Sequence, residues 1–494
     1  MEEILSQPPF TKIPIKKSNK TIRFLTFNVN GIKTICNYHP WNQFKQEFND
    51  IFLSLKSDII TLQELKLTIN TTLNEIKNIG HLKNYRSFIS LPTKKKGYSG
   101  VGLFIKKPEN DEEKQIYTVV KAEEGLTGYL SDKSGTRYRD QEDKIGGYTN
   151  DMSESEALNL DSEGRCVIVE LINNLVIFAL YCPANSQGTE EGETFRLLFL
   201  QQLLKRCENL HNLGKRIIIM GDINVSLDLI DSAEGINDRL GLKIIEDIRD
   251  GVNFEIENYK ECINFKFSRK SRELMNKYVI QSMIYLLRDK QKINYSNYQI
   301  FYDTTRIYQG RRKKMYTVWN TLTSSRQINY GSRIDLILCN CTKMIKHTSN
   351  ADILPFIQGS DHCPVFTDFE NWNEENEEGK EKKDIMIELN KYQDKKIMFE
   401  AKNHFKLNKI RDISTLFGKR NFIESNGSSE SISSSTSSRT SSPQPEISKD
   451  NKETETDQKS NSKKPKVLVY KSRKTIDNNK LSSSSKKSIN DYFL

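Results

Sequence analysis

Polar residues that together can activate water stand beside short runs of apolar residues. In the sequence Gly-Asp-Ile-Asn, the acid Asp222 and the amide Asn224 are two residues apart. On an extended chain both point to the same face, so together they can orient one water molecule. Asp335 lies in another apolar run, and His362 follows a Gly-Ser-Asp sequence. An imidazole held by a distant carboxylate keeps one tautomer and a stabilised charged form, although a surface or capping histidine is the alternative.

A further acid and two amides follow other apolar runs. Glu64 ends the run Ile59–Leu62, where a carboxylate is costly to desolvate unless a cation neutralises it. It is therefore a candidate metal ligand, and a solvent-facing glutamate is the alternative. Asn28 and Asn30 follow a predicted strand and can orient a phosphate or a metal-bound water, although asparagine is also an ordinary turn residue. Tyr181 ends another run, where its phenol either donates to a phosphoryl oxygen or packs.

Short apolar runs of strand length alternate with helix-like stretches at Trp41–Leu55 and Thr194–Leu210. This alternation predicts layers of sheets and helices, with the side chains at strand ends facing one cleft. Two long segments, 121–162 and 250–315, look inserted. The strands are predicted at Ile22–Phe27, Ile59–Leu62, Val101–Ile105, Cys166–Leu171, Leu175–Tyr181, Ile217–Met220 and Ile334–Leu338.

Composition narrows the class of protein. A formal net charge of +10 favours polyanionic partners, with simple solubility as the alternative. The 8 cysteines form no CxxC pair, so no structural zinc site is predicted. The N-terminus lacks an apolar signal core and no run of 18 apolar residues occurs, which predicts an intracellular protein with no membrane span.

Taken in order, these segments resemble the exonuclease III branch of the endonuclease/exonuclease/phosphatase superfamily over Thr21–Phe369. Within that branch, Asn37–Trp41, Tyr181–Pro183 and Asn329–Asp335 are similar to the eukaryotic AP endonuclease 2 type. The resemblance implies a four-layered α/β sandwich, two central mixed β-sheets flanked by helices. It also implies a nuclear, monomeric AP endonuclease with 3′-5′ exonuclease and 3′-phosphodiesterase activity, acting in base excision repair on DNA with abasic or blocked 3′ ends.

The resemblance also implies roles for individual residues, with Mg²⁺ (or Mn²⁺) as the cofactor. Oxygen ligands with open positions suit these ions better than zinc. The implied metal ligands are Glu64, Asn30, Asp361, Asp222 and Asn224. The implied catalytic residues are Asp222, which activates water, Asn224, which places it, Tyr181 and His362, which hold the phosphate, and Asp335, which orients His362. The implied substrate-binding residues are Asn28, Asn185, Arg165 and Trp319.

Some positions depart from the family pattern. Asn30 stands where many members have Asp, Ala184 moves an amide to Asn185, and Ser332 replaces an aromatic that lines the abasic pocket in some relatives. No cysteine follows Cys363, so the zinc-binding GRF module of many relatives is not expected. The basic residues of the segment 250–315, with Trp319 nearby, are expected either to contact a DNA backbone or to form a solvated face.

The expected organisation is an N-terminal extension (1–20), a catalytic domain (21–370), a polar, mostly disordered tail (371–485) and a terminal peptide (486–494). In that peptide Ile489, Tyr492 and Phe493 have the spacing of a sliding-clamp ligand of the PCNA type, although Lys486 replaces the usual Gln. A weaker match starts at Ile413, and the basic run Lys463–Lys466 is a candidate nuclear import signal.

Two other kinds of function stay open on the sequence alone. The first is another phosphodiesterase of the superfamily, such as an RNA 3′ exonuclease, a tyrosyl-DNA phosphodiesterase or a lipid-phosphate enzyme. The second is a catalytically inactive adaptor that tethers DNA to the clamp.

Overall fold

The computed structural model describes residues 12–67, 73–93, 97–280, 299–370, 389, 391–392 and 395–407. The candidate clamp peptide, its weaker copy at Ile413 and the basic run at Lys463–Lys466 lie outside these residues. Within them, no helix is both long and apolar enough to cross a membrane.

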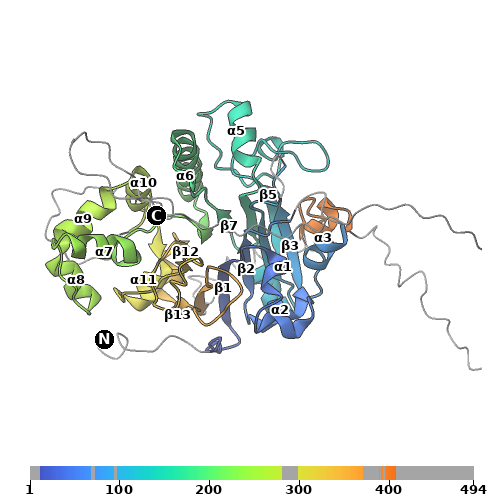
Figure 1. Cartoon of the computed structure of the whole chain (residues 1–494). Coiled ribbons are helices and arrows are strands. Elements are labelled where there is room, and N and C mark those ends of the chain that lie inside the picture. Colours follow the sequence, from blue (N-terminus) through green and yellow to red (C-terminus); the bar gives the residue numbers. More distant parts are fainter. Residues whose placement is uncertain are drawn as a thin grey trace, which may run out of the picture. The chain divides into compact units, whose positions relative to one another are not determined.

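Two six-stranded mixed sheets form the centre of the described fold (Figure 1). In each sheet one pair of neighbouring strands is parallel, β1 with β2 and β7 with β8, and the other pairs are antiparallel. The first sheet has the order β13 (Thr348–Ile353), β14 (Val365–Glu370), β1 (Thr21–Asn28), β2 (Ile59–Gln63), β4 (Val101–Lys106) and β3 (Tyr85–Ser90). The second has the order β5 (Val119–Glu124), β6 (Cys166–Leu171), β7 (Leu175–Tyr181), β8 (Arg216–Asp222), β12 (Asp335–Cys339) and β9 (Tyr302–Asp303).

Three apolar cores hold the layers together. One lies between the sheets and includes Phe24 and Val167. A second packs helices against the outer face of the first sheet, and a third packs α6 and α10 against the second sheet. This is the predicted four-layered α/β sandwich, and the prediction is confirmed. The helices are α1 (Ile32–Ile35), η2 (Trp41–Phe44), α2 (Phe48–Ser54), α3 (Leu73–Gly80), α4 (Asp111–Tyr117), η3 (Tyr138–Asp140), α5 (Glu154–Asp161), α6 (Glu190–Asn212), η4 (Leu229–Asp231), α7 (Ala233–Gly241), α8 (Gly251–Glu257), α9 (Tyr259–Phe267), α10 (Lys270–Tyr278), α11 (Thr304–Gln309), α12 (Thr342–Lys346) and α14 (Ala401–His404).

All seven predicted strands are present, within two residues at each end. The long helix at the second predicted position is α6, whose Thr189 side chain accepts a hydrogen bond from the Gly192 backbone N–H and caps the helix start. The single helix predicted over Trp41–Leu55 is wrong. Lys45 and Gln46 adopt a positive φ, which ends η2 before α2 begins.

The described part of the segment 250–315 is not a solvated loop. It contains α8, α9, α10 and α11, and its residues Arg306, Arg311 and Arg312 form ion pairs. Buried Arg311 pairs with both Asp228 and Glu255, and Arg312 pairs with Asp352. The expectation that this whole basic stretch faces DNA or solvent is therefore wrong, because these guanidiniums neutralise carboxylates inside the fold.

Residues 395–407 extend the fold beyond residue 370, where the sequence predicts the catalytic domain to end. Ile397 and Phe399 are buried in the core between the sheets, and Leu407 is buried in the core outside the first sheet. Glu400 forms a bridge to Phe88 of the edge strand β3 and an ion pair with Arg86. This segment therefore covers a sheet edge that would otherwise present unpaired backbone groups.

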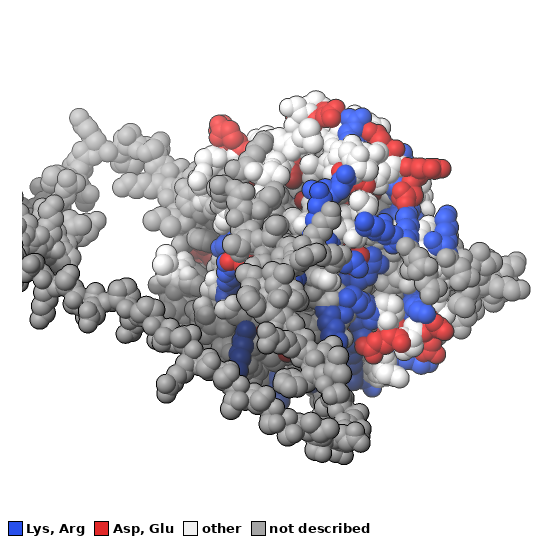
Figure 2. Space-filling model, turned by 90° about the vertical axis from the view of Figure 1, so that its right-hand side faces the viewer, with Lys and Arg blue, Asp and Glu red and all other residues white. Residues whose placement is uncertain are grey.

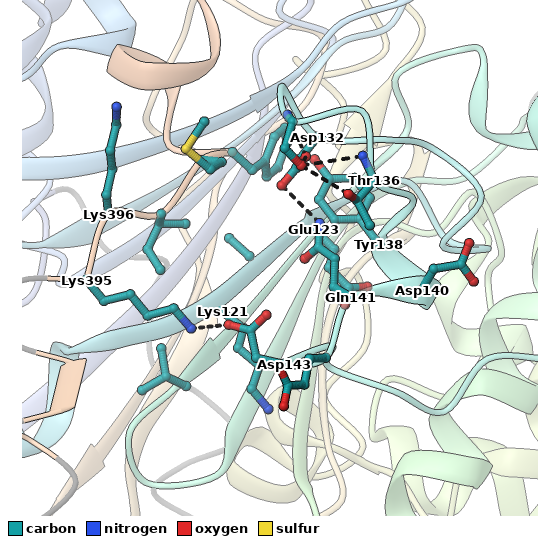
Figure 3. Close-up of a pocket in the computed structure, with 17 residues that line it drawn as sticks. Lys121, Glu123, Asp132, Thr136, Tyr138, Asp140, Gln141, Asp143, Lys395 and Lys396 are labelled. Carbon is teal, nitrogen blue, oxygen red and sulfur yellow. Dashed lines mark hydrogen bonds and ion pairs between the residues drawn. The ribbon is translucent and has the colours of Figure 1, made fainter.

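A pocket of about 380 Å³ lies between this segment and the insertion that follows β5 (Figure 3). Lys395 forms an ion pair with Asp143 across it, and Lys396, Asp132 and Tyr138 also line it.

Figure 2 looks onto the side that carries α3 and α14 in Figure 1 and shows Lys and Arg side chains gathered there. On this side, burial and the charges of Lys107, Lys402 and Lys77 lower the pKa of His81.

Asp231 joins the helical insertion to the second sheet. It is fully buried and accepts hydrogen bonds from Arg333 at 2.8 and 3.0 Å. Arg306 of α11 also pairs with it, and Arg333 in turn donates to Asp303 at 2.7 Å. Removing the acid leaves two buried guanidiniums without their shared counter-charge.

We expect Asp231→Ala to lower the free energy of unfolding by about 3–5 kcal/mol, as measured by urea denaturation. Asp247 pairs with Lys313 but its side chain is 66% exposed, so Asp247→Ala is the matched control and is expected to cost less than about 1 kcal/mol. Equal losses in the two variants would contradict this account of the network.

Candidate active site

The candidate site forms where the ends of the two sheets meet. In the antiparallel pair of β8 and β12, Asp222 lies directly opposite Asp335. In the parallel pair of β1 and β2, Asn28 and the residue before Glu64 are partners. The Asn28 amide nitrogen donates 3.0 Å hydrogen bonds to both Glu64 Oε1 and Asp222 Oδ2. A single side chain therefore joins carboxylates that belong to different sheets.

His362 completes the group from the loop before β14. Its Nδ1 is 2.8 Å from Asp335 Oδ2, and its Nε2 is 3.9 Å from Asp222 Oδ2. Although burial disfavours the imidazolium, the Asp335 charge and hydrogen bond raise the pKa of His362 to about 10. Burial and the Asp335 charge also raise the pKa of Asp222. The arrangement predicted for His362 and Asp335 is present.

Two groups of side chains in this cleft bring possible metal-ligand atoms close together. Asp222, Asp335 and His362 offer ligand atoms that all lie within 4.8 Å of one another, and Asp335 Oδ1 is buried without a hydrogen-bond partner among the described residues. The second set is Glu64, Asn30 and Asp361, in which the Asn30 amide donates to Asp361 Oδ1 at 2.9 Å.

The ammonium of Lys66 marks the second set as a place for positive charge. It is 3.1 Å from Glu64 Oε2 and also donates to Asn30 Oδ1. Burial opposes ionisation of Glu64, but the Asn28 hydrogen bond and the Lys66 charge hold its pKa below the ordinary value. Because the Lys66 side chain is 36% exposed, it can leave these oxygens to a divalent ion. The donor set therefore fits Mg²⁺ or Mn²⁺.

Backbone conformation also distinguishes this cleft. Asn30, Glu64 and Asn224 all have φ between 47° and 57°, a region that residues other than glycine rarely adopt. Asn224 turns so that its backbone N–H donates to Asp222 Oδ1 at 3.0 Å and its amide donates to the Cys182 carbonyl at 2.8 Å. Such conformations persist where the surrounding structure holds them and are frequent at functional sites.

Tyr181 reaches the same cleft with the help of Arg165. The Arg165 guanidinium lies 4.7 Å from the centre of the Tyr181 ring and donates to the Tyr181 carbonyl at 3.1 Å. Its Nε also donates to Glu163, and the residue is only 3% exposed, so its contacts are structural. Burial and the charge of Glu64 raise the pKa of Tyr181, which keeps the phenol protonated and able to donate.

Two predicted substrate-binding residues lie outside the acidic cluster. The Asn185 amide donates to the Thr189 carbonyl and to Glu193, so it holds the turn before α6. Trp319 lies in the short strand β10 (Val318–Trp319), paired with β11 (Gly331–Ser332), and its indole donates to Asn329. Trp319, Ser332 and Asp361 line a pocket of about 370 Å³ beside the cluster.

Three supporting residues were not identified from the sequence. Ser360 donates to the Asn28 carbonyl at 2.7 Å and accepts from the His362 backbone N–H, and its place in the Gly-Ser-Asp-His motif was an available signal. Thr317 Oγ1 accepts from the backbone N–H groups of Ile334 and Asp335. Arg196 donates to the Asn224 carbonyl. The last two stand in no motif, because only the fold brings them here.

Comparison with known proteins agrees with this geometry. A model described as "Endonuclease/Exonuclease/phosphatase family" matches residues 25–362. The chain belongs to this family. The predicted resemblance is thereby confirmed, and the protein is a phosphodiester-hydrolysing enzyme of a family that depends on divalent metal.

Relatives of the chain share one description. "DNA-(apurinic or apyrimidinic site) endonuclease 2" of Saccharomyces cerevisiae is 47% identical over 366 residues, which are 72% of this chain and 68% of the relative. The protein of the same description from Schizosaccharomyces pombe is 33% identical over 352 residues, 70% of this chain and 58% of the relative. The crystal structure of the Xenopus laevis APE2 catalytic domain matches with a TM-score of 0.51 and 26% identity, covering 71% of this chain and 92% of that one.

The bridging amide generates a test of the metal site. Because Asn28 orients Glu64, we expect Asn28→Ala to weaken Mn²⁺ binding by about 10–100-fold in isothermal titration calorimetry. Asn185→Ala is the matched control, since that amide contacts neither Glu64 nor Asp222, and it is expected to bind Mn²⁺ like the wild type. An unchanged Mn²⁺ affinity in Asn28→Ala would show that Glu64 needs no such support.

Proposed function

We propose that this protein is a DNA-(apurinic or apyrimidinic site) endonuclease with 3′-5′ exonuclease and 3′-phosphodiesterase activity, acting in base excision repair. The observation that carries the proposal is the set Glu64, Asn28 and Asp222, joined by hydrogen bonds across the two sheets, with His362 Nε2 3.9 Å from Asp222 in the same cleft. The shared description of the yeast relatives supports DNA with abasic sites as the substrate.

In this proposal the chain's own residues prepare a water molecule for attack on phosphorus. Asp222 takes the proton of the water, and both of its oxygens are held in place, by the Asn28 amide and by the Asn224 backbone N–H. The Asn224 amide nitrogen donates to the Cys182 carbonyl. The amide oxygen of Asn224 then orients that water.

Other residues would hold the phosphate and disperse its charge. His362 is charged over a wide pH range beside Asp335 and donates from Nε2, while the protonated phenol of Tyr181 supplies a further donor. The Asn28 amide already donates both of its N–H groups, to Glu64 and to Asp222, so Asn28 positions these acids and does not hold the phosphate, contrary to the role that the sequence had implied. Glu64, with Asn30 and Asp361, would hold Mg²⁺ or Mn²⁺. When bound, the ion supplies a Lewis acid for the phosphoryl oxygen and the leaving 3′-oxygen.

The pocket of Trp319, Ser332 and Asp361 supports an abasic nucleotide as the group beside the scissile phosphate. One wall is an aromatic ring buried under the Arg326 guanidinium, 4.5 Å from its centre, so the wall is rigid. A deoxyribose without its base is small enough for such a cavity of about 370 Å³.

The competing functions are separated by one set of substrates. With Mg²⁺, we expect incision of a duplex that carries one abasic analogue and trimming of a 3′-recessed duplex. Cleavage confined to single-stranded RNA, to a 5′-tyrosyl end or to a phosphoinositide would indicate another phosphodiesterase of the family, and no cleavage of any of them would indicate the inactive adaptor.

The role of Asp222 has its own test. We expect Asp222→Ala to lower kcat on the abasic duplex by about 10²–10⁴-fold, as for loss of a general base, with DNA affinity largely retained. Asp238→Ala, an exposed acid on α7, serves as the control and should keep the wild-type rate. A rate near wild type in Asp222→Ala would refute its assignment as the base.

We also propose that the protein acts as a monomer in the nucleus and binds a sliding clamp of the PCNA type through Ile489, Tyr492 and Phe493. The basic run Lys463–Lys466 supports nuclear import, and the spacing of the three apolar residues supports the clamp contact.

Deleting Lys486–Leu494 is expected to abolish clamp binding in a pull-down and to spare cleavage of short oligonucleotides, because a terminal peptide lies outside the cleft residues in sequence. The matched variant replaces only Tyr492 and Phe493 by Ala and should behave in the same way. Undiminished clamp capture by either variant would exclude this peptide as the contact.

A further inference from the structure

The loop between β13 and β14 carries Asp361 and His362 into the cleft. Strand β10 holds one side of this loop. The Trp319 backbone N–H donates to the Asp361 carbonyl at 3.0 Å, and Val318 forms an isolated bridge with His362. The remaining carbonyl groups of the loop need partners from elsewhere in the fold, because a buried backbone oxygen without a hydrogen bond is costly. Whatever supplies those partners also decides where the His362 side chain lies.

Arg326 supplies four of these partners from the segment between β10 and β11. Its Nη1 donates to the Ser360 carbonyl at 2.8 Å and to the His362 carbonyl at 3.4 Å. Its Nη2 donates to the carbonyls of Pro355 and Ile357, at 3.0 and 2.6 Å. A single guanidinium therefore joins the first half of the loop to the half that carries the imidazole.

These hydrogen bonds leave Arg326 with few donors for DNA. An arginine has five N–H donors, one of them on Nε, and here both terminal nitrogens already donate twice. Arg326 also lines a pocket of about 610 Å³ together with Asn30 and Asp361, so direct contact with a phosphate is the alternative role. Because its terminal donors are occupied by carbonyl oxygens, the contacts favour support of the loop over contact with the substrate.

The same guanidinium lies over the ring of Trp319. Its central carbon is 4.5 Å from the ring centre, and the tryptophan is buried. Trp319 and Asp361 line the pocket of about 370 Å³ beside the acidic cluster. The ring holds the flat face of the guanidinium while the carbonyl oxygens hold its edge, an arrangement that suits arginine and not lysine. Arg326 therefore connects the wall of this pocket to the loop of His362.

We propose that Arg326 is a positioning residue for phosphodiester cleavage, which fixes the loop of His362 against the Trp319 wall and acts through the imidazole without touching DNA. In the structure His362 Nε2 is 3.9 Å from Asp222 Oδ2, and the loop backbone sets this separation. A displacement of a catalytic group by about 1 Å can cost about 100-fold in rate. The inference rests on the proposed function, since the role of His362 does.

Arg326→Lys tests the positioning role, because it keeps the positive charge but loses the planar fork that reaches several carbonyls at once. We measure kcat and KM on the abasic duplex with saturating Mg²⁺, so that a weaker metal site does not enter the result. We expect kcat to fall by about 10–100-fold with KM nearly unchanged. A wild-type kcat, or a loss confined to KM as for a direct phosphate contact, would overturn the inference.

A double-mutant cycle with His362→Ala tests the route of the effect. If Arg326 acts through the imidazole, Arg326→Lys should cause little further loss of kcat once the imidazole is absent. Changes at independent sites instead add in free energy. A double variant whose loss equals the product of the two single losses would therefore contradict the proposal.

Arg137→Lys is the matched control. Arg137 lies 5.7 Å from the centre of the Tyr129 ring and pairs with Asp140, in the insertion after β5 and outside the cleft. We expect this variant to keep the wild-type kcat, and a loss as large as that of Arg326→Lys would overturn the inference. Arg326→Gln, whose amide has two N–H donors, covers the case in which Arg326→Lys does not fold, and the same outcomes decide.

The inference and the proposed function fail in different ways. A wild-type protein that cleaves none of the DNA substrates would overturn the function. A wild-type protein that cleaves abasic DNA while the folded Arg326 variants keep its kcat would overturn the positioning role alone.

Discussion

The hydrogen bonds of Asn28 to Glu64 and Asp222 are the interaction on which the rest of the site depends. These acids come from different sheets and would repel each other in a partly dry cleft. One amide that donates to both fixes their separation without adding charge. The Ser360 hydroxyl donates to the Asn28 carbonyl and accepts from the His362 backbone N–H, so the acids and the imidazole share one framework.

Buried acids have basic partners in the interior of the fold but are only partly neutralised at the site. Away from the cleft, buried acids such as Asp231 and Asp228 are matched by guanidiniums or an ammonium within hydrogen-bond distance. Within the cleft, Asp222 faces Asp335 with only one imidazole between them. In the cleft, a divalent cation can neutralise the remaining negative charge, and a phosphodiester can bind beside it. The ion pairs of Asp231 and Asp228 leave no such place.

Much of the fold was predictable because its strands are short apolar runs that stop at polar residues, and every one of the seven predicted strands formed. The break in the helix at Lys45 and Gln46 was not predictable, because neither residue type requires a positive φ. The helices of the segment 250–315 were also missed. Their charged residues look like a solvated surface in the sequence, and only distant partners such as Asp228 and Asp352 make them interior.

The sequence by itself identified the residues to which we assign the chemistry, because Asp222, Asn224, Asp335 and His362 stand in short motifs whose residue types and spacing have few other uses. It also determined the family and the layered architecture, since these follow from local patterns read in order. Only the tertiary structure decided that Arg165 supports Tyr181, that Lys66 lies against Glu64 and Asn30, and that Thr317 and Arg196 hold the loops of the site. Apart from the contact of Lys66 with the nearby Glu64, these contacts join residues that are far apart in the sequence, so no local pattern predicts them.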